Sequence, residues 1–104
     1  MTTFDDRENA FEAKFAHDAE LQFKCEARRN KLLGLWAAGL MGKDAAAAEA
    51  YAREVVASDF EEAGDEDVFR KVASDLGDRA DAAAIRAKMA ELMTEAKRQV
   101  MNEV

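Results

Sequence analysis

Nucleophilic or metal-dependent chemistry would have to start from His17 and Cys25, the only histidine and the only cysteine of the chain. A zinc site needs four nitrogen, sulfur or oxygen ligands, and a helix would hold these two side chains about two turns apart, too far to share one ion. The chain also lacks a glycine-rich phosphate loop, a G-x-S-x-G turn and an H-E-x-x-H helix. We therefore expect no catalytic residue and no metal site, in a protein that is not an enzyme.

Charged side chains gather in two places, and each cluster allows a binding role and a purely structural one. The acidic cluster consists of Asp59, Glu61, Glu62, Asp65, Glu66 and Asp67. Its spacing does not fit a calcium loop, and capping of a helix explains Asp65. The basic cluster consists of Arg28, Arg29 and Lys31. These side chains could contact an anion or a nucleotide phosphate, or they could cover the edge of an apolar stripe and pair with acids on neighbouring helices.

The elements that position these side chains are helices, because apolar residues recur at helical spacing and proline is absent. Gly42, Gly64 and Gly77 mark breaks between helices. Asp44, Asp65 and Asp81 can cap the helices that follow these breaks. The predicted helices cover about residues 4–40, 45–61, 66–76 and 82–101. Gly34 lies inside the first of them at a cost of roughly 1 kcal/mol relative to alanine, which indicates close approach of another helix.

The first predicted helix carries two apolar stripes. Phe4, Phe11 and Phe15 fall within about 40° of one another on a helical wheel. A second stripe, centred roughly 80–90° away, contains Leu21, Cys25, Leu32, Leu35 and Trp36. We infer that the second stripe anchors a folded body and makes Cys25 a buried core thiol. The first stripe either binds a partner or packs on the folded body, and the sequence leaves both possibilities open.

These patterns predict an all-α fold: a small, irregular antiparallel four-helix bundle over residues 20–104, with a mobile, partly helical N-terminal arm over residues 1–19. The net charge of −7 over 104 residues argues against binding to nucleic acid or to an anionic membrane surface. The start of the chain lacks a secretory signal, and no stretch is apolar enough for membrane insertion. We expect a cytoplasmic protein.

Two blocks of the sequence carry a family resemblance: FDDRE with its following phenylalanines, and EARRNKLLGLWAA with GDEDVFRK. With them the whole chain resembles the ζ subunit of the alphaproteobacterial F-type ATP synthase, an ATPase inhibitor family. The resemblance implies an inhibitory arm that becomes helical as it wedges into an α/β catalytic interface of the head, near the central stalk. There it would block rotation in the hydrolysis direction, at the cytoplasmic face of the inner membrane. The residues implied to bind the partner are Thr3, Phe4, Asp5, Asp6, Arg7, Glu8, Phe11, Lys14 and Phe15.

The resemblance also leaves an alternative function open. The family is associated with binding of adenine nucleotides by the bundle, so the chain could be a nucleotide-binding helical regulatory module without strong inhibitory activity. Arg28, Arg29 and Lys31 are then the candidate nucleotide contacts, and ATP or ADP would be a regulatory ligand. We expect no required cofactor, and a monomer when the protein is free.

Overall fold

The computed structural model describes the backbone of residues 3–59 and 65–103, and the side chains of 9–59 and 65–103. The chain is 90% helical, which confirms the predicted all-α class. Its elements are α1 (Thr3–His17), α2 (Ala19–Leu40), α3 (Ala45–Ser58), α4 (Glu66–Leu76), the 3₁₀ turn η1 (Gly77–Arg79) and α5 (Ala82–Glu103). No strand occurs within these two ranges.

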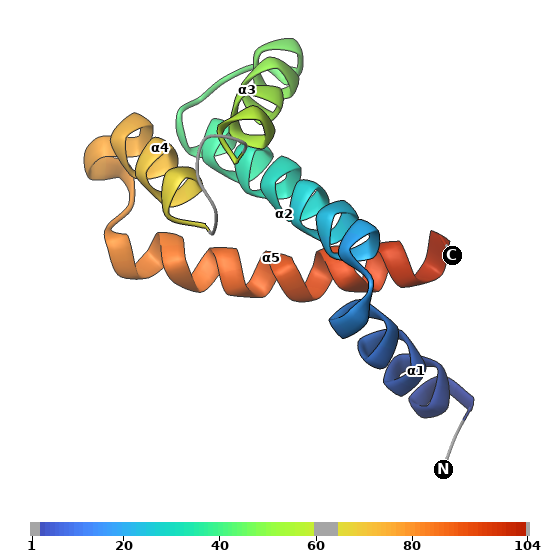
Figure 1. Cartoon of the computed structure of the whole chain (residues 1–104). Coiled ribbons are helices and arrows are strands. Elements are labelled where there is room, and N and C mark those ends of the chain that lie inside the picture. The colour runs from blue at the N-terminus through green and yellow to red at the C-terminus, as the bar shows by residue number, and fades with distance from the viewer. Residues whose placement is uncertain (1–2, 60–64, 104) are drawn as a thin grey trace.

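Helix α2 lies at the centre of the molecule and contacts α1, α3, α4 and α5. Figure 1 shows α5 running in the opposite direction to α2, so that the end of α5 lies near the start of α2. Helices α3 and α4 pack at the other end, and α1 leaves the body beside the end of α5 (Figure 1). Helices α2 to α5 thus form the predicted irregular four-helix bundle. None of the described helices combines the length and apolar character needed to cross a bilayer.

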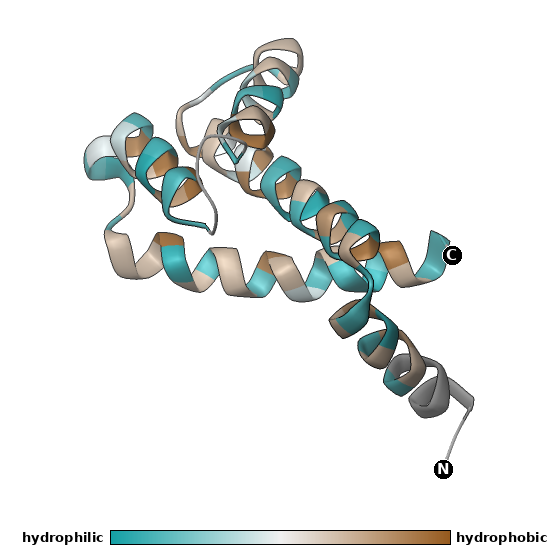
Figure 2. Ribbon diagram, in the orientation of Figure 1, coloured by the Kyte–Doolittle hydropathy of each residue, from teal (hydrophilic) through white to brown (hydrophobic). Residues whose placement is uncertain are grey.

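The main core lies where α2, α3, α4 and α5 meet. Its buried residues are Leu33, Ala37, Ala38, Tyr51, Val55, Val68, Val72, Leu76, Ile85 and Met89. Figure 2 shows the hydrophobic residues of α4 on the side that faces α2. The predicted stripe of α2 is correct at Leu21 and Cys25 but wrong in its second half, because Leu32, Leu35 and Trp36 are only partly buried. The buried line runs through Leu33, Ala37 and Ala38 instead.

Gly34 accounts for part of this difference. A Cβ atom at Gly34 would lie 2.6 Å from Cα of Ala52, so the glycine lets the backbones of α2 and α3 approach closely. The predicted close approach of another helix at Gly34 is confirmed. At this point α2 and α3 meet through a glycine and an alanine, not through the large side chains of the predicted stripe.

Aspartates cap two of the helices as predicted. Asp44 Oδ1 accepts a hydrogen bond from Ala47 N at 2.9 Å, and Asp81 Oδ1 accepts one from Ala84 N at 2.8 Å. Asp65 occupies the predicted N-cap position of α4, but its carboxylate makes no cap hydrogen bond and pairs with an arginine of α2 instead. Helix α3 ends at Ser58, earlier than predicted. The predicted break at Gly64, and Glu61 and Glu62, lie outside the described residues.

Candidate functional site

The first predicted helix is two helices, separated at Asp18. This residue has an extended backbone with φ −116° and ψ 102°, and its Oδ1 accepts a hydrogen bond from Leu21 N at 3.1 Å. Gln22 Nε2 donates to the carbonyl oxygens of Phe15 and Ala16 at 2.9 and 3.3 Å, which satisfies the end of α1. The chain therefore changes direction at a single residue, and α1 is joined to the body without a flexible loop.

Phe11 is the residue of α1 most firmly attached to the body. It is only 6% exposed and packs with Leu21, Cys25, Val100 and Met101, a group that we call the Cys25 cluster. Of the two possibilities that the sequence left open for the phenylalanine stripe, the structure shows packing on the folded body for Phe11. The break at Asp18 explains the two stripes, because it turns the face of α1 that carries Phe11 onto the ends of α2 and α5.

Phe15 is partly buried beside the same cluster. Its ring stacks on that of Phe11 with the centroids 6.4 Å apart. Lys97 Nζ of α5 lies 4.3 Å from the Phe15 centroid and 3.6 Å from Glu12 Oε2. A cation over an aromatic face and an ion pair thus join α1 to α5 through one lysine.

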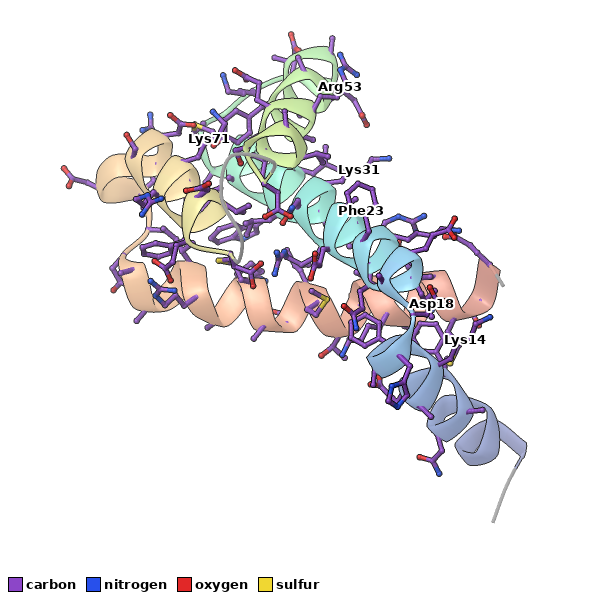
Figure 3. All side chains as sticks on the ribbon, in the orientation of Figure 1. Lys14, Asp18, Phe23, Lys31, Arg53 and Lys71 are labelled. Atoms are coloured by element: carbon purple, nitrogen blue, oxygen red, sulfur yellow. The ribbon has the colours of Figure 1, made fainter. Side chains whose placement is uncertain are left out.

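The other predicted arm residues are placed less completely. The backbone of α1 includes Thr3, Phe4, Asp5, Asp6, Arg7 and Glu8, but their side chains lie outside the described ones. Lys14 is exposed (Figure 3) and borders a shallow hollow of about 220 Å³ with Asp18, Glu20, Leu21 and Lys24. The start of α1 points away from the body (Figure 1).

Cys25 is a buried thiol, as predicted, with no exposed surface. Burial raises its pKa, while the positive charge of Lys97 acts in the opposite direction. A raised pKa keeps the thiol protonated and unreactive at neutral pH. Among the described residues, no three histidine, cysteine, aspartate or glutamate side chains lie close enough together to hold a metal ion.

The predicted basic cluster separates in the fold. Arg28 makes a bidentate contact with Glu103 of α5 at 2.6 and 2.9 Å, which raises the pKa of Arg28 and lowers that of Glu103. Arg28 and Lys31 border a hollow of about 450 Å³ between α2 and α3, beside Phe23, which is 53% exposed (Figure 3). Arg29 lines a different hollow. For Arg28, pairing with an acid on a neighbouring helix is the alternative that the structure shows.

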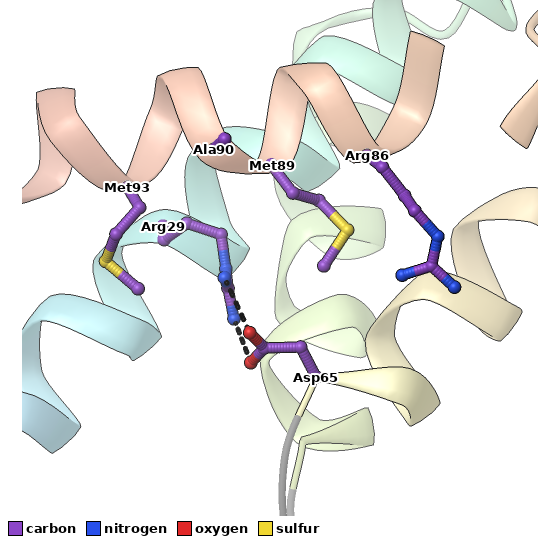
Figure 4. A pocket seen from close by; sticks show the side chains of 6 residues that line it. All are labelled: Arg29, Asp65, Arg86, Met89, Ala90 and Met93. Atoms are coloured by element: carbon purple, nitrogen blue, oxygen red, sulfur yellow. Dashed lines mark hydrogen bonds and ion pairs between the residues drawn. The ribbon is translucent and has the colours of Figure 1, made fainter. Parts of the chain in front are cut away.

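The hollow beside Arg29 measures about 330 Å³ and is drawn in Figure 4. Arg29 is 2% exposed, and its guanidinium donates to Asp65 Oδ1 at 2.8 Å and to Asn30 Oδ1 at 2.6 Å. Arg86 of α5 lies on the same hollow, where it pairs with Glu66 and covers the Phe69 ring. Both guanidinium groups are thus already paired with carboxylates from the start of α4.

Sequence reasoning missed three features of this site. The N-cap at Asp18 had a local signal, since an aspartate followed by Glu20 in the first turn is typical of a helix start. The two contacts of Lys97, with Glu12 and with Phe15, had no local signal, because at least 82 residues separate Lys97 from either partner along the chain. Only the antiparallel path of α5 along α2 brings them together.

The comparisons with known proteins agree with this architecture. A family model described as ATPase inhibitor subunit zeta matches residues 1–99. No curated protein matches the chain. A solved structure titled "Solution NMR structure of the protein" is 57% identical, with a TM-score of 0.75. The match covers 81% of this chain and 99% of that one.

Proposed function

We propose that this chain, which belongs to the ATPase inhibitor subunit zeta family, inhibits ATP hydrolysis by the F-type ATP synthase through its N-terminal helix. Helix α1 would wedge into an α/β catalytic interface of the head, near the central stalk, and block rotation in the hydrolysis direction. The observation that supports this most is the position of α1, which projects from the body and is joined to it through one non-helical residue, Asp18 (Figure 1).

The arm has the composition of a helix that binds in a groove. Phe4, Phe11 and Phe15 would be its apolar anchors, in the manner of an amphipathic helix laid into a hydrophobic groove. Acidic residues near its start favour helix formation there and can pair with basic groups of the enzyme. The arginine and lysine of the arm would pair with acidic groups. The remaining proposed contacts are Thr3, Asp5, Asp6, Arg7, Glu8 and Lys14.

Such an inhibitor works by obstruction and needs no catalytic residue of its own. We propose a division at residue 19, with residues 1–19 as the inhibitory arm and 20–104 as the bundle that holds the arm at the head. The partner would be the catalytic head, comprising the α, β and central stalk subunits, at the cytoplasmic face of the inner membrane. The free protein would be a cytoplasmic monomer.

The test is the ATPase rate of the matching ATP synthase head with the full chain, with residues 20–104 alone, and without addition. We expect inhibition by the full chain only, provided that circular dichroism shows the shortened chain to be folded. Lys14→Glu on α1 should weaken inhibition, because it reverses an exposed charge of the arm. Arg53→Glu reverses an exposed charge on α3 and serves as the matched control. Equal rates in all three conditions would refute the proposal.

A second candidate function is binding of ATP or ADP by the bundle. The observation that favours it is the hollow in Figure 4, where Arg29 and Arg86 present two guanidinium groups beside the apolar side chains of Met89 and Met93. A nucleotide phosphate would have to replace a carboxylate partner of one arginine. Titration with ATP, followed by amide chemical shifts, should then move resonances around this hollow or around Arg28 and Lys31. Shifts confined to other parts of the chain would contradict nucleotide binding at these residues.

A further inference from the structure

The contact between α1 and the bundle covers two of the residues that the proposed function assigns to the partner, Phe11 and Phe15. Phe11 is 6% exposed because the Cys25 cluster encloses it, and Phe15 is covered from one side by Lys97. A ring enclosed in this way has no face left for a second groove. Phe11 therefore cannot fill an apolar pocket of the enzyme while it occupies the Cys25 cluster.

The contact is also small enough to open. Three of the described side chains of α1 make these contacts with the bundle. Phe11 and Phe15 pack in or beside the apolar cluster, and Glu12 and Phe15 contact Lys97. An isolated helix of this length is marginal in water, so undocking and loss of helix can occur together. The main core lies at the other end of α2, so undocking of α1 would uncover the Cys25 cluster and leave the main core in place.

We propose that α1 alternates between a docked state, seen here, and an undocked state, and that the undocked state is the one that inhibits the ATP synthase. The docked state would be autoinhibitory, because it withholds Phe11 from the enzyme. This inference rests on the proposed function for its partner, but the opening of α1 can be measured without any enzyme. If only the undocked fraction binds, the apparent affinity is lowered by that fraction.

Cys25 supplies the measurement. It is the only cysteine of the chain, it has no exposed surface, and it belongs to the same buried cluster as Phe11 of α1. Alkylation by iodoacetamide, followed by mass spectrometry of the whole protein, therefore reports how often the cluster is uncovered. Local openings of this kind are seen through the reaction rate of the buried group.

The informative variant is Lys97→Ala, which removes the cation over Phe15 and the ion pair with Glu12 but leaves the arm itself unchanged. Each of these contacts is weak, and together their loss should raise the undocked fraction about fivefold. Because the charge of Lys97 lowers the pKa of Cys25, its loss would by itself slow alkylation. A faster reaction in the variant therefore reports opening and not a more reactive thiol.

Lys88→Ala is the matched control on the same helix. Lys88 lies 5.7 Å from the Trp36 centroid and 2.9 Å from Glu91, and its side chain is 27% exposed against 26% for Lys97. It has the same two kinds of contact but is outside the Cys25 cluster. Its removal should leave the alkylation rate unchanged.

We expect Lys97→Ala to raise the alkylation rate about fivefold and to lower the half-inhibitory concentration against the ATP synthase head by the same factor. An unchanged alkylation rate, or a rate in the natural chain equal to that in guanidinium chloride, would overturn the docked state. Faster alkylation with unchanged inhibition would overturn the competition between docking and binding. If neither protein inhibits the head, the proposed function fails, and with it the inhibitory role of the undocked state, while the alkylation rates still decide whether α1 opens.

Discussion

Replacement of Phe11 by alanine tests the most consequential contact of the arm. Burial of a phenylalanine side chain is worth about 1.5–3 kcal/mol. The cost of Phe11→Ala cannot exceed the free energy of docking α1, because the variant can undock its arm and keep the rest of the fold. We therefore expect a loss of about 2 kcal/mol, less than the 3–5 kcal/mol typical of a phenylalanine in a closed core. A change of this size lowers Tm by roughly 10 °C in a domain of this length.

The assay is thermal and urea unfolding followed by circular dichroism, with Phe23→Ala as the control. Phe23 lies on α2, the next helix, and is 53% exposed, so its removal should cost less than about 1 kcal/mol. Equal Tm values for the two variants would refute the burial of Phe11 in solution. A loss above about 4 kcal/mol would show that α1 is an integral part of the core, and would refute the reasoning that docking limits the cost.

Three further changes follow from the structure. Gly34→Ala should destabilise the protein by about 1–3 kcal/mol in urea unfolding, because the new Cβ atom would lie 2.6 Å from the backbone of Ala52. The control is Gly39→Ala, whose Cβ atom would meet nothing within 4 Å, so this variant should be neutral or stabilising. Asp18→Ala removes the N-cap of α2 and should cost about 1 kcal/mol, measured in the same way. Glu26→Gln should stabilise the protein at neutral pH and not in acid, because burial, aided by two nearby aspartates, raises the pKa of Glu26. The folded state then holds its proton more tightly, so the stability of the natural chain falls as pH rises through the ordinary glutamate pKa toward the raised one.

Each of these predictions has a contrary result. Equal destabilisation by alanine at Gly34 and Gly39 would contradict the close approach of α2 and α3. An unchanged stability of Asp18→Ala would show that the break between α1 and α2 does not depend on the cap. If Glu26→Gln still stabilises the protein at a pH below the ordinary glutamate pKa, the stabilisation has a cause other than removal of the charge.

Much of the fold was predictable from local patterns. Helical spacing and the aspartates at Asp44, Asp65 and Asp81 located three of the helix starts, because such a start signal depends only on residues within one turn. Gly34 indicated a close helix contact for a similarly local reason. The patterns did not give the partner of a side chain where a local role competed with a distant one: Asp65 is at the N-cap of α4, but its carboxylate pairs with Arg29.

The sequence by itself determined that this protein is helical and that it carries an aromatic stripe at its start. These properties depend on residue types and on spacing along one helix. Only the tertiary structure decided where the stripe goes. The path of α5 back along α2 brings Lys97 and Val100 to the start of α2, and the break at Asp18 turns Phe11 onto them. Such contacts join residues far apart in the chain, so no local pattern records them.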